Sequence, residues 1–310
     1  MAISRGQLVK ELEPGLNALF GLEYKRYENQ HAEIYTTESS DRAFEEEVML
    51  SGFANASVKA EGAGVSFDNA QETFTARYTH ETVALAFAIT EEAIEDNLYD
   101  RLASRYTKAL ARSMSNAKQV KSVEPLIQGL PTTNNFDSGD GVSLFNTAHP
   151  TVAGTFANTL ATQADLNETS LEQSMIDIAQ MTDERGLRIA ARGVKMIIPS
   201  ELQFTAERLM KSQGRTGTAD NDINAIVSMG MVPQGYRVNN YLTDSDAFYI
   251  LTDVPNGMKM FNRAPLTTAM EGDFDTGNVR YKARERYSFG VSDYRAVSYT
   301  HLTLPTNREV

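Results

Sequence analysis

The chain has no cysteine and only four histidines among its 310 residues. Without thiols it forms neither disulfides nor zinc sites with thiolate ligands, and this usage fits folding in a reducing cytoplasm. The histidines are His31, His80, His149 and His301. None stands four residues from a second ligand on a predicted helix, so the sequence predicts no metal site.

Long apolar runs are also missing. No segment approaches the 18 apolar residues of a membrane-spanning helix, and the first fifteen residues lack the apolar centre of a signal peptide. Positive charge is in deficit, because 29 Lys and Arg against 41 Asp and Glu give a net charge of −12. Broad binding to nucleic acid or membrane surfaces is therefore disfavoured, because both need basic faces.

Catalytic motifs are nearly absent. There is no Gly-x-Ser-x-Gly elbow or P-loop, and Gly62-Ala-Gly64 lacks the third glycine of a dinucleotide site. Asp275-Thr-Gly277 matches the aspartic-protease triplet once, whereas those enzymes need two such aspartates. The same turn has Arg284 where a calcium loop has its twelfth-position glutamate. We predict a protein that is not an enzyme and holds no cofactor or metal.

The length allows one large or two small domains, and the clearest element is a helix over 90–123. Thr90 suits its N-cap, and Pro125 is expected to stop it. Large apolar side chains recur every four residues at Ile94, Leu98, Leu102, Tyr106, Leu110 and Met114. At 1.5 Å per residue the helix would be about 50 Å long, which implies an elongated domain.

Two segments before this helix have too few apolar residues for cores of their own. Residues 1–48 predict an arm with one helical face, interrupted at Pro14-Gly15, that packs either on its own domain or on a neighbour. Residues 51–89 predict a long hairpin whose alternation slips near Thr79–Thr82. Its middle, Ala54 to Gln71, is either a disordered surface loop or an extension ordered by a partner subunit.

The second half predicts an α+β unit behind a polar connector over 129–164, in which His149 is a turn residue. Thr169 or Ser170 would cap a helix that Gly186 ends. The remaining predictions are a buried strand at 194–198, a helix from Pro199 with Phe204, Leu209 and Met210 inside, and strands at 236–239, 247–251 and 258–261.

The stretch from Glu271 to Val297 alternates strictly. Arg280, Lys282, Arg284 and Arg286 share one strand face, and the other face is apolar and aromatic, interrupted only by Glu285. A monomer gains nothing from four adjacent cations. In a chain this acidic, the nearest acidic surface is another copy of itself.

Several stretches, in order along the chain, resemble major capsid proteins of tailed bacteriophages with the Hong Kong 97-type fold, and look closest to Mu-like major head subunits. They are FAITEEAIEDN at 87–97, LFNTAHP at 144–150, RTGTADNDIN at 215–224, YLTD at 241–244, DVPNG at 253–257 and the segment 272–290. The resemblance implies an α+β Hong Kong 97-like capsid fold. Its implied parts are an N-terminal arm (1–48), an extended β-hairpin loop with its base (49–89), a peripheral domain with the spine helix and connector (90–164), an axial domain (165–264) and returning peripheral strands (265–297).

The implied function is a structural head protein that assembles as hexamers and pentamers into an icosahedral shell around double-stranded DNA. Its implied partners are itself, a portal protein, packaged DNA without sequence specificity, possible decoration proteins and a separate scaffolding protein. It would be found in the virion, and in the host cytoplasm during assembly. The alternatives are an encapsulin-like compartment and, more distantly, a hydrolytic enzyme.

The candidate contacts between subunits pair the four cations of 280–286 with Glu61, Asp68 and Glu72 of a neighbour's loop. The alternative leaves these cations solvated and facing DNA. Lys59 is the only lysine of the loop, but no acceptor motif is visible, so we expect no covalent cross-link. Residues 298–310 resemble translated sequencing-adapter sequence rather than the family's tail after Ser292-Asp-Tyr-Arg295, so we expect native sequence to end near Val297.

Overall fold

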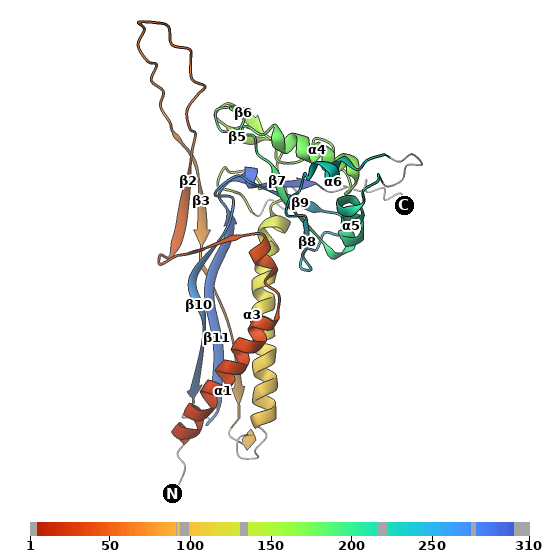
Figure 1. Cartoon of the computed structure of the whole chain (residues 1–310). Helices are drawn as coiled ribbons and strands as arrows, with labels where there is room; N and C mark the ends of the chain where they lie inside the picture. Colours follow the sequence, from red (N-terminus) through yellow and green to blue (C-terminus); the bar gives the residue numbers. More distant parts are fainter. Residues whose placement is uncertain are drawn as a thin grey trace, which may run out of the picture.

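A long sheet with two helices laid along it forms a stem, and a second sheet with shorter helices forms a head at one end (Figure 1). The computed structural model describes residues 5–90, 92–93, 99–130, 136–215, 222–273 and 277–300. Among them, none of the helices combines the length and apolar character that a membrane crossing requires.

The stem sheet has the order β1 (Thr36–Ser39), β10 (Met258–Gly272), β11 (Val279–Val291) and β4 (Glu81–Ile89). Only β1 and β10 pair in parallel. The helices α1 (Arg5–Arg26) and α3 (Tyr99–Gln128) pack together over one face of this sheet. The stem core contains Leu16 and Phe20 of α1, Leu110 and Met114 of α3, and Tyr281 and Ala283 of β11. The arm helix thus packs on its own chain.

The head sheet has the order β12 (Val297–Thr300), β9 (Phe248–Thr252), β7 (Gly193–Ile198) and β8 (Tyr236–Val238). Around it lie α4 (Glu168–Ala179), α5 (Gln203–Lys211), α6 (Ala225–Met229), the ribbon of β5 (His149–Thr151) and β6 (Gly154–Phe156), and the 3-10 turns η2 (Ser200–Leu202) and η3 (Tyr294–Ala296). The larger core of the molecule lies here.

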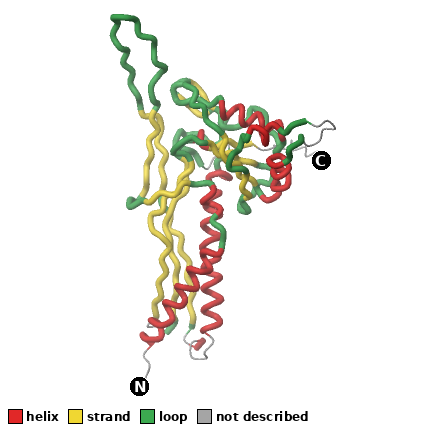
Figure 2. The backbone as a smooth tube through the Cα atoms, in the orientation of Figure 1, coloured by secondary structure: helices red, strands yellow, loops and turns green. Residues whose placement is uncertain are grey.

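A two-stranded ribbon, β2 (Phe44–Leu50) with β3 (Glu72–Thr79), projects from the junction of stem and head. Its tip, residues 51–71, contains no strand and extends beyond the rest of the chain (Figure 2). The slip predicted near Thr79–Thr82 is a change of sheet. β3 pairs with β2, and after His80 the same stretch of chain continues as β4 beside β11.

Both long helices pass through a proline that we expected to end or interrupt them. Pro14 lies inside α1, and Pro125 inside α3, which continues to Gln128. Each proline removes one intrahelical hydrogen bond, and side-chain packing along the helix holds the backbone despite that loss. Tyr106, which belongs to the predicted apolar stripe, is 49% exposed. Thr90 accepts a hydrogen bond from the Ala93 amide, as an N-cap does, while residues 94–98 lie outside the described residues.

The head differs from its prediction in several places. Asn167, not Thr169 or Ser170, caps α4, and it exchanges hydrogen bonds with Ser170. The helix ends at Ala179, so Gly186 lies in a later turn. Phe204 faces solvent at 70% exposure rather than the core. The connector over 129–164 is only partly polar, because Leu144 and Phe145 are fully buried within it.

Two predicted boundaries fall inside strands. β10 continues through the boundary at 264/265, where its pairing with β11 shifts register between Asn262 and Thr267. Residues 297–300 form β12, which pairs with β9 and is buried throughout. The head sheet therefore includes residues 298–300. Residues 301–310 lie outside the described residues.

The turn that follows α1 is fixed to α3 through a buried histidine. His31, in η1 (Gln30–Glu33), donates its backbone N–H to Gln119 Oε1 at 3.0 Å, and its Nδ1 lies 3.1 Å from Gln119 Nε2. Because an amide nitrogen only donates, this geometry requires an unprotonated Nδ1. Burial, helped by the nearby charge of Lys118, lowers the pKa of His31 to about 4.

We predict that His31 makes the fold acid-sensitive. Its folded pKa lies below the ordinary value of about 6.5, so the unfolded chain binds more protons between these values and stability falls as pH falls through that window. His31→Asn should remove roughly 2–3 kcal/mol of the loss between pH 7 and pH 4.5. Urea unfolding of both proteins at the two pH values measures this difference. An unchanged acid loss in the variant would contradict it.

Candidate assembly surfaces

The root of the hairpin is held to the stem by a buried polar cluster. Glu47 of β2 accepts hydrogen bonds from Lys259 of β10 and from Ser292, just after β11. Lys259 also pairs with Glu38 of β1 at 3.2 Å. The Tyr78 hydroxyl of β3 lies 2.5 Å from Ser292 Oγ, so both ribbon strands reach the same serine. The opposite charges of Glu47 and Glu38 hold the Lys259 ammonium in place despite its burial.

A close approach of the backbone completes this root. The Tyr78 ring packs against Phe261 and over Gly290, where a Cβ would lie 2.5 Å from the ring. On the other side, Gly139 adopts a φ of +97°, and a Cβ there would lie 2.3 Å from the Thr75 carbonyl oxygen. Neither position has room for a side chain. The ribbon is thus held firmly at its base, and Arg185 of the head also donates a hydrogen bond to the Asn69 carbonyl at 2.7 Å and lies 4.0 Å from Asp68. The part of the tip beyond these contacts extends away from the body.

The hairpin acids differ in their surroundings. Asp68 Oδ2 accepts from the Ala54 amide at 2.7 Å, which ties the two limbs of the tip together. That bond and one from the Asn69 amide lower the pKa of Asp68. Lys59, Glu61 and Glu72 are exposed. Within the described part of the chain, no ion pair joins these hairpin acids to the cations of β11.

The cations of β11 lie on the sheet face that the helices leave open. Arg280, Lys282 and Arg284 are exposed, and their neighbours on β4 are Ala88, Ala86 and Ala84. Arg280 pairs with Asp273 of the preceding turn. Lys282 and Arg284 form no ion pair with any described residue. We call Arg280, Lys282 and Arg284 the basic sheet face.

Arg286 does not belong to this face. It is half-buried, its Nε has no hydrogen-bond partner among the described residues, and its charge helps to lower the pKa of His80. The larger cause of that lowered pKa is burial of the imidazole. Arg286 therefore lies at the bend between β3 and β4, and Lys282 and Arg284 are the two β11 cations left for a partner.

Glu285 explains how a carboxylate fits on the apolar face of β11. Lys118 of α3 pairs with it at 3.2 Å, and the Tyr24 hydroxyl of α1 donates to it at 3.4 Å. Burial raises its pKa, while Lys118 opposes the rise. Glu285 thus joins β11 to α3 through a buried ion pair and to α1 through a hydrogen bond.

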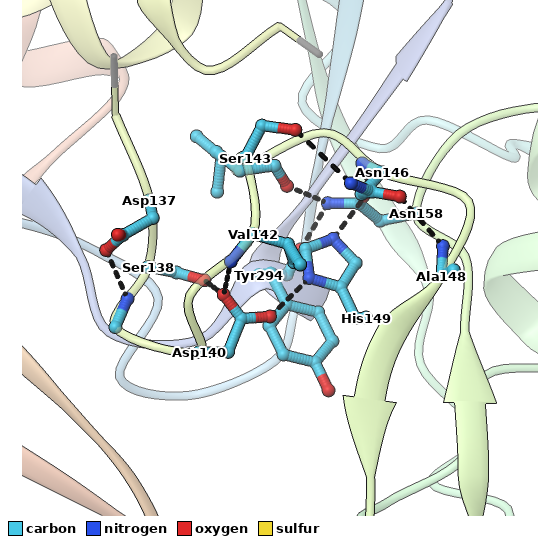
Figure 3. A network of polar contacts seen from close by, with 12 residues as sticks. Asp137, Ser138, Asp140, Val142, Ser143, Asn146, Ala148, His149, Asn158 and Tyr294 are labelled. Atoms are coloured by element: carbon cyan, nitrogen blue, oxygen red, sulfur yellow. Dashed lines mark hydrogen bonds and ion pairs between the residues drawn. The ribbon is translucent and has the colours of Figure 1, made fainter. Parts of the chain in front are cut away.

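A second buried network lies at the base of the head (Figure 3). His149 Nδ1 lies 2.6 Å from Asp140 Oδ2, and its Nε2 lies 3.2 Å from Asn158 Oδ1. The Asn158 amide donates to the carbonyls of Leu144 and Tyr294, and the Tyr294 ring stacks on the imidazole at 3.9 Å. His149 is satisfied, as predicted, but it opens β5 and is fully buried. Since no substrate can reach this imidazole, its role is structural.

A cleft of about 600 Å³ separates the hairpin root from the head. It is lined by apolar side chains of β2 and by the carboxylates Glu47, Asp183, Glu184, Asp253 and Asp293. At its wall, Arg295 binds Glu184 at 2.7 Å and Asp293 at 3.3 Å. Among the described residues, no three His, Asp or Glu side chains are placed so that they could hold one metal ion together. The cleft therefore offers a charged wall but no recognisable catalytic set.

A family model described as phage capsid protein matches residues 72–300, which include the ribbon strand β3, the head and all of the stem except α1 and β1. The chain belongs to this family. No curated protein matches the chain. Among solved structures, the chain is similar to the procapsid protein of bacteriophage JBD30 (TM-score 0.54, 14% identity, 98% of this chain and 78% of that chain). It is also similar to the virus-like particle of Pyrococcus furiosus (0.53, 10%, 93% and 98%) and the capsid of Myoviridae phage XM1 (0.52, 10%, 87% and 89%).

This phage capsid protein therefore has the expected Hong Kong 97-type fold and a structural role in the shell of a virion. Its closeness to Mu-like head subunits stays a prediction. Sequence reasoning found the basic sheet face from its alternation. It missed the Glu47, Lys259 and Ser292 cluster, because these residues are far apart in the chain and only the fold brings them together.

Proposed function

We propose that this capsid protein assembles as hexamers and pentamers into a closed icosahedral shell that encloses double-stranded DNA. The observation that carries the proposal is the hairpin tip. Val58 and Phe67 are 100% and 98% exposed at its end, on a ribbon whose root is rigidly seated. Such side chains gain burial only on another chain.

We further propose that the tip lies on the stem of a neighbouring copy, where Glu61 meets Lys282 and Arg284. Glu72 begins β3 at the other end of the same limb, which at ~3.3 Å per residue is too far from Glu61 for both acids to share these two cations. The basic sheet face is flat beside the three alanines of β4, which leaves room for an extended segment. Asp68 contributes less than its charge suggests, because its oxygens already bind backbone amides. Lys59 is exposed at the tip, and we retain the prediction that it forms no covalent cross-link.

The remaining assignments support this proposal in part. We assign the predicted arm to α1 and the segment after it, the extended loop to the hairpin, the peripheral domain to the stem and the axial domain to the head. Two parts differ from the predicted bounds. β5 and β6 of the predicted peripheral connector lie beside the head sheet, and β4 of the predicted loop belongs to the stem sheet. A portal, a separate scaffolding protein, a decoration protein and a cytoplasmic assembly stage stay predictions. The Pyrococcus furiosus particle shares the fold, so the fold alone does not separate a virion from an encapsulin-like compartment; membership of the phage capsid family favours the virion.

Particle mass tests the proposal directly. The full chain, expressed alone, should form megadalton shells by light scattering and negative-stain microscopy, or discrete pentamers and hexamers that close when a scaffold is added. A chain that stays monomeric with scaffold would overturn the proposal.

The charge pairing predicts a reversible defect. Lys282→Glu/Arg284→Glu should weaken each subunit contact roughly tenfold, since the exposed contacts of Glu61 with these two cations, worth up to about 1 kcal/mol each, become repulsive. Adding Glu61→Lys to the same chain should restore part of the particle yield. Sedimentation of the assembled fraction measures both. Lys25→Glu/Arg188→Glu, which changes net charge equally at exposed positions elsewhere, is the control. Equal losses in the two reversed variants, without restoration, would exclude the pairing.

A further inference from the structure

A second set of cations lies on the outward side of α3, across the stem from the basic sheet face. Arg105, Lys108 and Arg112 follow one another at three- and four-residue steps, so they form one ridge on the helix. All three are exposed, and none forms an ion pair or hydrogen bond with any described residue. The other two cations of this stretch are used internally, because Lys118 pairs with Glu285 and Lys121 with Glu81.

Residues 103–123 of α3 contain no acidic residue, although the chain has 41. Glu124, which follows them, has a side chain that is 46% exposed, but it pairs with Lys121 at 3.8 Å. The exposed side chains of α3 are Arg105, Tyr106, Lys108, Ala109, Arg112, Ser113, Asn116 and Val120. Those of α1 are Pro14, Ala18, Leu22, Lys25 and Arg26, with Gly15 between them. Like charges at these helical spacings repel each other weakly, and an anion bound along the ridge would remove that repulsion.

We propose that this surface binds the phosphate backbone of nucleic acid. We call Arg105, Tyr106, Lys108, Arg112, Ser113 and Asn116 the donor face, because each of these side chains can donate a hydrogen bond. They span about 16 Å along the helix, enough for two or three successive phosphates. Arginine binds phosphate through two parallel N–H groups, and Ser, Asn and Tyr commonly contact phosphate oxygens. The inference rests on the proposed function, in which the shell encloses DNA.

The donor face suits a polyanion better than an acidic protein. A stable protein interface needs an apolar centre, and the middle of this face offers only Ala109. The net charge of −12 does not prevent binding, because at about 0.1 M salt charges more than ~10 Å away are largely screened. The ridge then acts through its local charge. In this proposal the basic sheet face contacts a neighbouring copy, and the donor face contacts the enclosed nucleic acid.

Salt-dependent binding tests this inference. The full chain, below the concentration at which light scattering detects shells, is titrated into a fluorescent 30-base-pair duplex between 20 and 150 mM NaCl. Three phosphate contacts predict a slope of about −2.7 for log K against log salt. Arg105→Gln/Lys108→Gln/Arg112→Gln should weaken binding roughly tenfold at the lowest salt and flatten the slope. The matched control, Arg280→Gln/Lys282→Gln/Arg284→Gln, removes the same charge from the other side and should bind as the parent does.

Two results would overturn the inference. Equal weakening by both triple variants would mean that the duplex senses only net charge. Tighter binding of poly-glutamate than of the duplex, at equal charge concentration, would assign the donor face to an acidic protein. Shell formation is scored separately, so intact shells without duplex binding would refute this inference alone, and duplex binding without shells would refute only the proposed function.

Discussion

Replacing residues 55–67 by Asn-Gly should abolish shell formation while leaving the subunit folded. The deletion removes Val58, Val65 and Phe67, which contribute nothing to the fold of one chain because they are exposed in it. Buried on a neighbour, each would contribute about 1.5–3 kcal/mol, so their joint loss weakens every contact by roughly a thousandfold or more. The Ala54–Asp68 clip stays in place and closes the shortened turn.

Gradient sedimentation and thermal unfolding separate the two effects of this deletion. The assembled fraction should vanish, and the Tm of the unassembled subunit should stay within about 2 °C of the parent, as expected for surface changes. Phe67→Ser/Val58→Ser, which keeps the length of the tip, should show the same defect in weaker form. Shells at the parental yield from the shortened chain would mean that the tip is a surface loop with no partner.

Removing Arg295 should destabilise the subunit by about 3–5 kcal/mol, because it leaves two buried carboxylates without a counter-charge. The Arg295 side chain is 3% exposed. It binds Glu184 and Asp293, donates from Nε to the Thr182 carbonyl at 2.8 Å, and lies 4.5 Å over the Tyr294 ring. We expect Arg295→Met to lower the Tm by roughly 6–15 °C.

The cause of the lost stability can be identified by also removing the charges of Glu184 and Asp293. Arg295→Met/Glu184→Gln/Asp293→Asn should recover most of the stability, whereas Arg192→Met, at an exposed arginine nearby, should change it by no more than about 0.5 kcal/mol. If the triple variant is no more stable than the single one, Arg295 acts mainly through packing on Tyr294 and Phe156.

The deficit of Arg295→Met should also depend on pH. Burial already raises the pKa of Asp293, and Arg295 opposes that rise. Without the guanidinium the folded carboxyl takes up a proton more readily than the unfolded one. Stability of the variant therefore falls as pH rises, and its deficit is larger at pH 8 than at pH 5. Urea unfolding at the two values measures the sign.

Sequence reasoning predicted the elements whose pattern is local. The alternation of β11, the buried Leu110 and Met114 of α3 and the apolar-poor hairpin each follow from spacing within one segment. Other predictions were wrong where contacts between distant segments determine the local structure. Pro125 remains helical because the surrounding turns are packed, and the connector around Asn158 is buried because that amide satisfies backbone carbonyls from two other segments.

The candidate site shows the same limit. Four cations share one parity in the sequence, but Arg286 is half-buried, because β10 shifts register opposite it at Ala264. The donor face of α3 could have been predicted from local composition, although the spacing of apolar residues does not indicate it. Residues 103–123 include five cations and no acid, in a chain with a large acidic excess.

β3 of the hairpin continues directly into β4 of the stem sheet, and the only residue between the two strands is His80. His80 is held between Ser40 and Ser288, each 2.9 Å from one ring nitrogen, so the bend itself is clamped. If a neighbouring subunit pushes the tip sideways, the force passes through this bend to β4, which is an edge strand of the stem sheet. Subunits linked through their tips would then share mechanical load along their stems, and a shell built from them would stiffen or twist as one connected frame.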